Sequence, residues 1–291
     1  MKIPKRLLPL IKDGLIDDVI CQLKSGKEAQ VYMVRCGEIV RCAKVYKEAT
    51  QRSFKQAVQY QEGRTERSSR RARAMEKKTS YGQKESEEAW LCAEVDALYR
   101  LAAAGVRAPQ PYSFIDGVLL MELITDGAGG AAPRLSEVSF SSEQALDYHS
   151  RLISEVVRML CAGLVHGDLS EFNVLLDHNG PVIIDLPQAV NAAGNNNARM
   201  MLERDVNNMS DYFGRYAPEL LTTAYGKEIW SHYESGDLYP GIKLTGHFAE
   251  STVSADVDGV ITVIDAALEE ELERRCREQE ASEGGASTPY L

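Results

Sequence analysis

Three oxygen-bearing side chains stand close together in this chain, at spacings that suit phosphoryl transfer. Asp168 and Asn173 lie in the run His-Gly-Asp-Leu-Ser-Glu-Phe-Asn at 166–173, and Asp185 follows the apolar run Val-Ile-Ile at 182–184. Phosphoryl transfer needs one carboxylate to orient the attacking hydroxyl, and an amide and a carboxylate to hold Mg²⁺ against phosphate oxygens. We therefore predict that Asp168 is the catalytic base and that Asn173 and Asp185 bind Mg²⁺, or Mn²⁺ in its place. The alternative is that Asp168 and Asn173 are turn residues and that Asp185 caps a strand.

A cation for the phosphates is expected on a strand near the N-terminus. Lys44 lies in the run Arg-Cys-Ala-Lys-Val-Tyr, on the third of three strand-like segments, where it could hold phosphate oxygens. The alternative is a solvated lysine. Its partner should be a glutamate on the next helix, and Glu94 is the best placed because it lies inside the apolar stripe that begins at Trp90. Glu87 and Glu88 are nearer the start of that helix, where acids are normally exposed.

Two further stretches could contact a nucleotide. The turn Ser-Gly-Lys-Glu-Ala at 25–29 would cover the phosphates, although it has a single glycine and lacks the Gly-Lys-Ser/Thr ending of a Walker A loop. The segment Met-Glu-Leu-Ile at 121–124 would form a hinge whose backbone meets the adenine edge, and an ordinary strand end is the alternative. The candidate contacts with ATP are Ser25, Gly26, Lys27, Val31, Lys44, Glu94, Glu122 and Ile124.

The rest of the pattern supplies elements that could position these residues. In chain order we expect an amphipathic helix over 1–20, strands at 19–23, 30–34 and 38–46, a helix from 89 to 105, a hairpin over 114–121, a flexible break at 126–133, a helix at 142–163, strands at 174–177 and 182–185, and helices within 198–234 and 246–291. This order predicts an α+β chain with a small, mostly β N-terminal lobe at 1–121, a mostly α C-terminal lobe at 122–245 and an acidic tail at 246–291. The Ala-Pro-Glu at 217–219 matches the end of a kinase activation segment, but we interpret it as coincidence because it falls in a helical stretch.

Charge is spread unevenly over the 291 residues. The net charge is −10, yet residues 50–84 hold ten Lys and Arg against three Glu. This basic segment could meet RNA phosphates, or it could be a solvated loop. The sequence shows no apolar run of about 18 residues and no secretory signal, so we expect no membrane contact. The six cysteines lack Cys-x-x-Cys spacing, which favours reduced thiols in a cytoplasmic protein over a zinc site.

Taken together, these motifs resemble the RIO family of atypical protein kinases, most closely the bacterial form of its Rio-one branch. The motifs that carry the resemblance are Ser-Gly-Lys-Glu-Ala-Gln-Val-Tyr at 25–32, Ala-Lys-Val-Tyr-Lys at 43–47, Arg-Ser-Phe-Lys at 52–55, the Trp90 helix with Glu94, His-Gly-Asp-Leu-Ser-Glu-Phe-Asn at 166–173 and Ile-Ile-Asp-Leu-Pro-Gln-Ala-Val at 183–190. The resemblance implies a two-lobed kinase fold trimmed of the activation segment and of the peptide-binding helices. One departure is the pair Leu186-Pro187 after Asp185, where Rio-one members commonly carry a different pair.

The resemblance also implies roles for particular residues. It implies Ser/Thr autophosphorylation, for which the basic segment offers Ser53, Ser68, Ser69 and Ser80. It further implies that Asp185 becomes an aspartyl-phosphate during ATP hydrolysis.

Three functions are compatible with these observations. The first is an ATP- and Mg²⁺-dependent serine/threonine kinase that acts on a protein substrate or on itself. The second is an ATP-driven conformational switch in ribosome assembly, with ribosomal RNA or a ribosomal subunit as its partner. The third is a small-molecule phosphotransferase, which His-Gly-Asp-Leu alone would also suit, although the Ser-Gly-Lys-Glu-Ala-x-Val-Tyr turn favours the first two.

Overall fold

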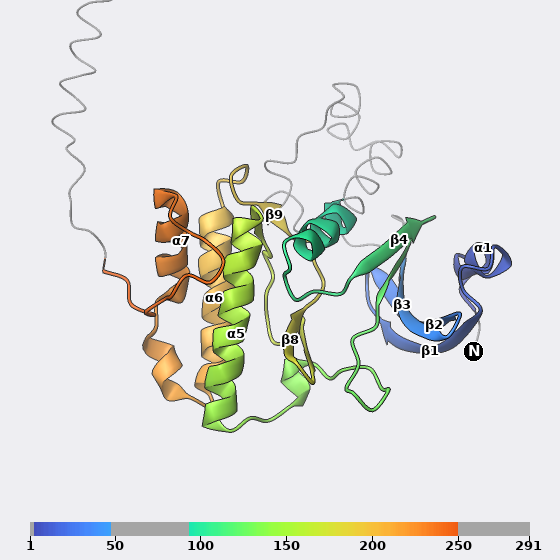
Figure 1. Ribbon diagram of the computed structural model, residues 1–291, viewed down its shortest axis with the longest axis horizontal. Helices are drawn as coiled ribbons and strands as arrows, with labels where there is room; N and C mark the ends of the chain where they lie inside the picture. Colours follow the sequence, from blue (N-terminus) through green and yellow to red (C-terminus); the bar gives the residue numbers. More distant parts are fainter. Residues whose placement is uncertain (1–2, 48–92, 250–291) are drawn as a thin grey trace, which may run out of the picture. The chain divides into compact units, whose positions relative to one another are not determined.

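The computed structural model describes residues 3–47 and 93–249, which combine an N-terminal antiparallel sheet with a helical C-terminal part (Figure 1). This arrangement confirms the mixed α+β class. By compactness the chain divides into Met1–Phe248 and Ala249–Leu291, and the described helices and strands all lie in the first unit. Within 3–47 and 93–249, no helix is long and apolar enough to cross a bilayer.

The N-terminal sheet has five strands in the order β1-β2-β3-β5-β4, and all neighbours are antiparallel. Its strands are β1 (Asp18–Ser25), β2 (Ala29–Cys36), β3 (Ile39–Tyr46), β4 (Pro111–Ile115) and β5 (Val118–Glu122). The predicted hairpin turn between β4 and β5 is present at Asp116 and Gly117, whose φ angles of 49° and 73° are those of a two-residue turn matched to the strand twist. Because β3 pairs with both β2 and β5, it lies in the middle of the sheet.

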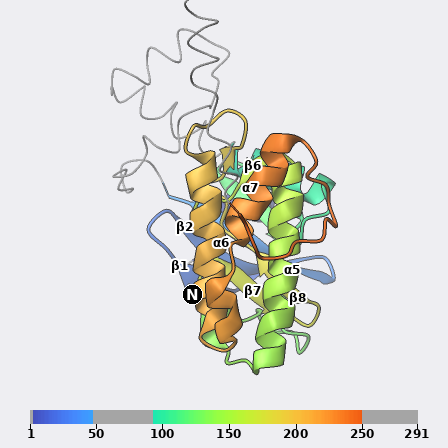
Figure 2. The same ribbon diagram turned by 90° about the vertical axis from the view of Figure 1, so that its left-hand side faces the viewer.

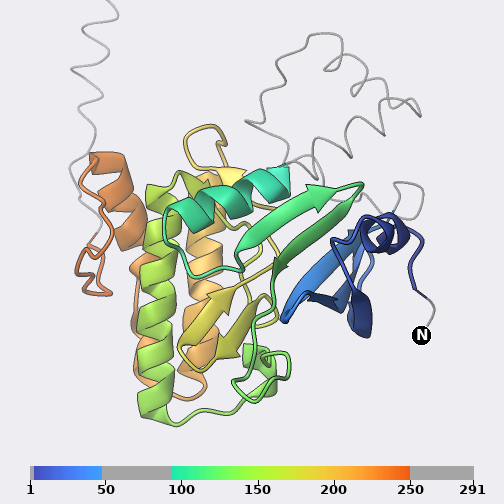
Figure 3. The same cartoon turned by 45° about the vertical axis from the view of Figure 1, so that its right-hand side comes forward.

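A helix over residues 93–103 lies against this sheet (Figure 3). Its inward face carries Val95, Leu98 and Leu101, which are buried in the main core. The spacing is that of one helix face, so the predicted apolar stripe is confirmed over the described part of this helix.

The helical part is built on α5 (Ser142–Cys161), α6 (Ala198–Gly214) and α7 (Tyr225–Ser235), which pack side by side (Figure 2). Ser141 caps the start of α5, where its hydroxyl accepts a hydrogen bond from the backbone N–H of Gln144 at 3.2 Å. Two short 3-10 helices, η2 (Leu135–Glu137) and η3 (Pro218–Thr222), complete this part. The predicted helices at 142–163 and within 198–234 are confirmed, and Ala-Pro-Glu at 217–219 lies at the start of η3.

Four short strands bring the predicted loop residues together. They are β6 (Leu164–Val165), β7 (Val174–Asp177), β8 (Gly180–Ile183) and β9 (Val190–Asn191), with β6 paired to β9 and β7 paired to β8. The loop at 166–173 runs from β6 to β7, and the segment 184–189 runs from β8 to β9. Since the strands at both ends are paired, these two connections must lie next to each other.

Three expectations need correction. The helix expected over 1–20 is wrong, because α1 covers only Leu7–Lys12 and Gly14, with a φ of 73°, leads the chain into β1. The strand expected at 182–185 starts and ends two residues earlier, since Asp185 has a φ of 67° and cannot continue it. The flexible break expected at 126–133 is a compact turn, in which the Asp126 carboxylate accepts backbone N–H groups from Ala128 at 2.8 Å and Gly130 at 2.9 Å.

Candidate active site

Lys44 projects from the middle of the N-terminal sheet. In the strand register it stands opposite Val31 of β2 and Leu119 of β5, so it is supported on both sides. Its Nζ lies 2.6 Å from Oε1 of Glu94 and 2.9 Å from Oδ1 of Asp185. The predicted pairing with Glu94 is present, and three residues that are far apart in the sequence meet at one ammonium group.

Glu94 reaches this cluster because it shares the buried face of the helix at 93–103. Only 2% of the residue is exposed, so its charge is almost fully removed from water. Its second oxygen, Oε2, accepts a hydrogen bond from the hydroxyl of Tyr46 at 2.6 Å. A buried carboxylate is stable only when it is paired and hydrogen-bonded, and here both oxygens are engaged.

The charges of the cluster reinforce one another. Burial alone would lower the pKa of Lys44, but the carboxylates of Asp185 and Glu94 raise that pKa well above its ordinary value. In return the Lys44 ammonium lowers the pKa of Asp185. Lys44 is therefore a permanent cation and Asp185 a permanent anion at neutral pH.

The loop at 166–173 holds Asp168 and Asn173 in contact. Nδ2 of Asn173 donates to the carbonyl oxygen of Asp168 at 2.8 Å and lies 3.5 Å from its carboxylate oxygen Oδ2. His166 joins this loop to the segment that leads to Asp185: its Nδ1 accepts the N–H of Asp168 at 3.2 Å, and its Nε2 lies 3.1 Å from the carbonyl oxygen of Ile184. The two ring nitrogens of His166 thus connect the two segments.

Asp168 has a partly buried carboxylate. Burial raises its pKa, an effect that the nearby His166 and Arg204 reduce. A carboxylate whose pKa is moved toward neutrality takes up a proton more readily, which suits a group that must accept one from an attacking hydroxyl.

Asn173 and Asp185 offer oxygens that fit a small divalent cation. The N–H of Ile184 donates to the carbonyl oxygen of Asn173 at 2.9 Å, so the two side chains come from adjoining backbone. Asn173 uses its amide nitrogen within the loop and Asp185 uses Oδ1 toward Lys44, which leaves Asn173 Oδ1 and Asp185 Oδ2 without donors among the described residues. Within 3–47 and 93–249 no group of three or more His, Cys, Asp or Glu could hold a metal by itself. Two protein oxygens, completed by phosphate oxygens and water, are the usual set for Mg²⁺.

A known protein domain spans all of these residues. A model of the RIO domain matches residues 30–225, a range that contains Lys44, the loop at 166–173 and Asp185. The chain belongs to the RIO family.

Individual RIO proteins are similar over most of this chain. It is 34% identical over 208 residues to the RIO-type serine/threonine-protein kinase Rio1 of Haloferax volcanii, which covers 71% of this chain and 67% of that protein. It is 31% identical over 236 residues to the Rio1 protein of Methanocaldococcus jannaschii, covering 77% of this chain and 74% of that one. It is 30% identical over 219 residues to the human serine/threonine-protein kinase RIO1, covering 74% of this chain but only 37% of the human protein. The chain is thus homologous to RIO-type serine/threonine kinases.

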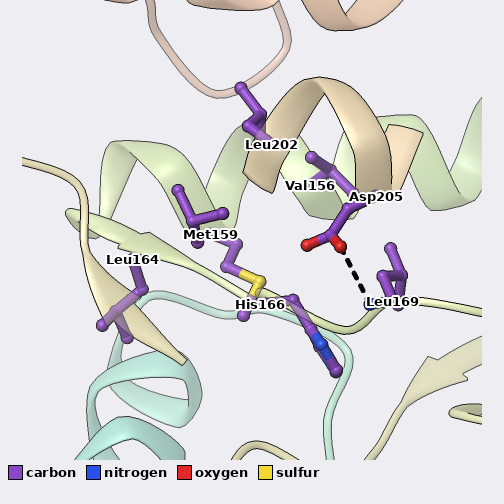
Figure 4. A pocket seen from close by; sticks show the side chains of 8 residues that line it. Val156, Met159, Leu164, His166, Leu169, Leu202 and Asp205 are labelled. Atoms are coloured by element: carbon purple, nitrogen blue, oxygen red, sulfur yellow. Dashed lines mark hydrogen bonds between the residues drawn. The ribbon is translucent and has the colours of Figure 1, made fainter. Parts of the chain in front are cut away.

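In this RIO domain the loop is held by Asp205, a residue that the sequence analysis did not single out. Its carboxylate, on α6, accepts a backbone N–H from Gly167 at 2.7 Å. It accepts a second backbone N–H from Leu169 at 3.1 Å (Figure 4). The neighbouring Arg204 donates to the carbonyl oxygen of Gly167. Asp205 is 1% exposed, and burial raises its pKa to about 6. An acidic residue among the apolar positions of a helix face is the sequence signal that could have identified Asp205.

A small cavity lies behind the loop, between α5 and α6 (Figure 4). Its volume of about 10 Å³ is at the lower limit for one water molecule, so it is a packing gap and not a ligand pocket. The residues that line it are Val156, Met159, Leu164, Val165, His166, Leu169, Leu202 and Asp205.

The turn expected over the phosphates closes between β1 and β2. The N–H of Gly26 donates to the carbonyl oxygen of Ala29 at 2.8 Å, and Nζ of Lys47 donates to the carbonyl oxygen of Gly26 at 2.7 Å. The side chains of Ser25 and Lys27 form no hydrogen bond or ion pair with any described residue, and their contact with ATP stays a prediction.

Lys24 is a cation at this turn that the sequence analysis missed. The register places Lys24, Val31 and Lys44 in one row across β1, β2 and β3, so all three side chains leave the same face of the sheet. Burial lowers the pKa of Lys24, and the nearby Arg134 lowers it further. The face that carries Lys44 therefore holds more positive charge than the motif alone suggests.

The predicted hinge at 121–124 begins within the last two residues of β5. The N–H of Glu122 already donates to the carbonyl oxygen of Gln110 at 2.8 Å, and the carbonyl oxygen of Ile124 accepts from Ala132 at 2.9 Å. In the described part of the chain nothing accepts the N–H of Ile124, which is the group suited to an adenine nitrogen. Two predicted regions lie outside the described residues. They are the basic segment 50–84, with Ser53, Ser68, Ser69 and Ser80, and the acidic tail from residue 250 onward, with its expected helix.

Proposed function

We propose that this chain is an ATP- and Mg²⁺-dependent serine/threonine protein kinase of RIO type, in the bacterial form of the Rio-one branch, which phosphorylates itself or a protein substrate in the cytoplasm. The observation that carries the proposal is the contact of Lys44 with both Glu94 and Asp185, beside the Asp168–Asn173 loop. Membership in the family and homology to RIO-type kinases support it. We infer that 1–121 and 122–245 act as the two lobes of a trimmed kinase, with 246–291 as a tail.

Each residue has a distinct task in this reaction. Lys44, held as a cation by its two carboxylates, would bind phosphate oxygens of ATP. Asp168 would accept the proton of the acceptor Ser or Thr hydroxyl as its oxygen bonds to the γ-phosphorus and ADP leaves. Asn173 and Asp185 would hold Mg²⁺, which when bound neutralises charge on the phosphates. Asp205 and His166 keep the loop that carries Asp168 in place.

The decisive test is Asp168→Ala, assayed for transfer of labelled phosphate from ATP to protein. We expect transfer to fall by about 10²- to 10⁴-fold while nucleotide binding is retained, because general base catalysis contributes that much. Asp211→Asn, which changes an exposed acid on α6, is the control and should leave transfer unchanged. Full transfer by the Asp168→Ala protein would reject the assignment.

A second candidate function is ATP hydrolysis that drives a conformational switch in ribosome assembly. It is favoured by Asp185, whose side chain is 44% exposed and whose pKa is lowered by Lys44, so an ionised carboxylate is accessible from solvent. In this route an Asp185 oxygen would bond to the γ-phosphorus, ADP would leave, and water would then hydrolyse the aspartyl-phosphate. Two results in the Asp168→Ala protein would favour this function over protein phosphorylation. Inorganic phosphate would still be released from ATP, and no acid-stable label would be found on Ser or Thr.

A further inference from the structure

Tyr46 lies beside Lys44 in the motif Ala-Lys-Val-Tyr-Lys at 43–47, and the proposed reaction gives it no role. The two residues are two positions apart on β3, so their side chains leave the same face of the sheet. The Tyr46 hydroxyl donates to Oε2 of Glu94 at 2.6 Å, while Lys44 donates to Oε1 of the same carboxylate at 2.6 Å. The Lys44 Nζ also lies 5.4 Å from the centre of the Tyr46 ring. Glu94 is thus held at both oxygens by neighbours from one strand.

Tyr46 is itself fixed from several sides. Its side chain is 1% exposed, and its ring packs edge-on against Phe114 with the ring centres 6.2 Å apart. Its backbone N–H donates to the carbonyl oxygen of Gly117 at 3.0 Å, and its carbonyl oxygen accepts from the Arg6 guanidinium at 3.0 Å. A hydroxyl on such a rigid side chain defines a fixed point for the carboxylate that it contacts.

The hydroxyl is a donor throughout the accessible pH range. Burial raises the pKa of Tyr46 well above its ordinary value, and the neighbouring Glu94 raises it further. The phenol therefore keeps its proton next to a buried carboxylate. Without this donor, Oε2 of Glu94 would be buried with no partner, and the side chain or its helix would have to move to find one.

We propose that Tyr46 is a positioning residue: by fixing Glu94 it fixes the Lys44 ammonium at the point where phosphates bind. This inference rests on the proposed function. It predicts that loss of the Tyr46 hydroxyl lowers the affinity for ligands that carry phosphates and leaves the affinity for the base and ribose unchanged. A merely structural role in the core would affect all ligands alike.

The test is Tyr46→Phe, with dissociation constants for Mg-ATP, Mg-ADP and adenosine measured by calorimetry. We expect affinity for ATP to fall about tenfold, which is the usual effect of losing one buried hydrogen bond to a charged group, with adenosine unchanged. The control is Tyr32→Phe: Tyr32 is also a buried tyrosine, 3% exposed, but its hydroxyl contacts Oε1 of Gln30 at 3.0 Å. It faces the opposite side of the sheet, since it pairs with Ala43, and its loss should change neither affinity.

Thermal unfolding of both variants shows that they are folded at the assay temperature, and a double-mutant cycle with Glu94→Gln completes the test. If Tyr46 acts through Glu94, Tyr46→Phe should cause no further loss of ATP affinity in the Glu94→Gln protein. The proposal would be overturned if Tyr46→Phe weakened the binding of ATP and of adenosine equally. It would also be overturned if the two substitutions caused additive losses of ATP affinity. If the wild-type protein transfers phosphate and the Tyr46→Phe protein binds ATP normally, the positioning role alone is overturned. If the wild-type protein binds no ATP, the proposed function is overturned as well.

Discussion

At Lys44 two carboxylates contact one ammonium group directly, whereas the loop that carries Asp168 is held through its backbone. The Lys44 cluster depends on side-chain charges from β3, from the helix at 93–103 and from Asp185. The loop depends on Asp205, a buried acid on α6, and on its hydrogen bonds to two backbone N–H groups. One region therefore places a charge, and the other places a peptide segment. Mutations in the two regions should fail in different ways.

The largest effect is expected at the charged cluster. Lys44→Met removes the cation that faces the phosphates and leaves Glu94 buried without its main partner. We expect phosphoryl transfer to fall by about 10³-fold, as when a preorganised charge is removed from a transition state, and the melting temperature to fall as well. Radiolabel transfer and calorimetric unfolding measure the two effects. Lys44→Arg is the matched variant: it keeps the charge, so most of the stability should return, while the different shape keeps transfer low.

A substitution that loosens the loop should lower phosphoryl transfer while it changes the charges around Lys44 much less. In Asp205→Asn one amide oxygen can still accept a backbone N–H, but the amide nitrogen then faces the other N–H. We expect transfer to fall about 10- to 100-fold with ATP affinity nearly unchanged, because Lys44 is not disturbed. A loss of ATP affinity equal to the loss of transfer would show that the two regions are not separable. The kinetic constants for ATP decide between these outcomes.

Much of this comparison could be predicted from the sequence, but not equally in both regions. Glu94 was expected beside Lys44 because helix periodicity marks the buried face, whereas Asp185 was expected at the site from its spacing after the loop, and both contact Lys44. Asp205 was missed because a hydrogen bond to backbone N–H groups leaves no trace in the partner residues. Nothing in Gly167 or Leu169 identifies them as donors.

Local errors had local causes. The helix predicted over 1–20 was too long, because Gly14, with a φ of 73°, follows α1 at Leu7–Lys12 and β1 begins at Asp18. The strand predicted to end at Asp185 overlooked that an Asp adopts a left-handed backbone more readily than most residues. That conformation ends the strand before Asp185, whose carboxylate meets Lys44.

The pH dependence provides a sharper test of the loop. Burial raises the Asp205 pKa to about 6 from 3.8, so its contribution to stability is full below pH 3.8 and is lost as pH rises toward 6. His149, buried beside Ser210, has its pKa lowered by burial to about 4 from 6.5, and its contribution is lost as pH falls over nearly the same range. Because the two contributions oppose each other, we expect them to leave stability nearly level between pH 4 and 6.

Activity should not be level in that range. As pH falls through about 6, Asp205 takes up a proton and one of its oxygens becomes a weaker acceptor for its N–H group, so we expect phosphoryl transfer to fall up to about tenfold. In Asp205→Asn this step should be absent, which leaves only the fall caused by protonation of Asp168. Rates and melting temperatures measured from pH 4 to pH 8 test both statements. A melting temperature that falls in parallel with the rate would attribute the acid limb to unfolding.

The smallest effect is expected at Lys24, which extends the comparison to the edge of the charged cluster. Lys24 shares a sheet face with Lys44 but lacks a carboxylate partner within ion-pair distance in the described part of the chain, so it can attract phosphates without being held in place. We expect Lys24→Met to weaken ATP binding about threefold, since partly exposed charges contribute little, and the difference to shrink as salt is added. Lys12→Met, which removes an exposed charge from α1, controls for net charge. If both variants weaken ATP binding equally, the effect comes from the overall charge of the protein. A loss confined to Lys24→Met would instead show that the row across β1, β2 and β3 contributes more than one cation to the site.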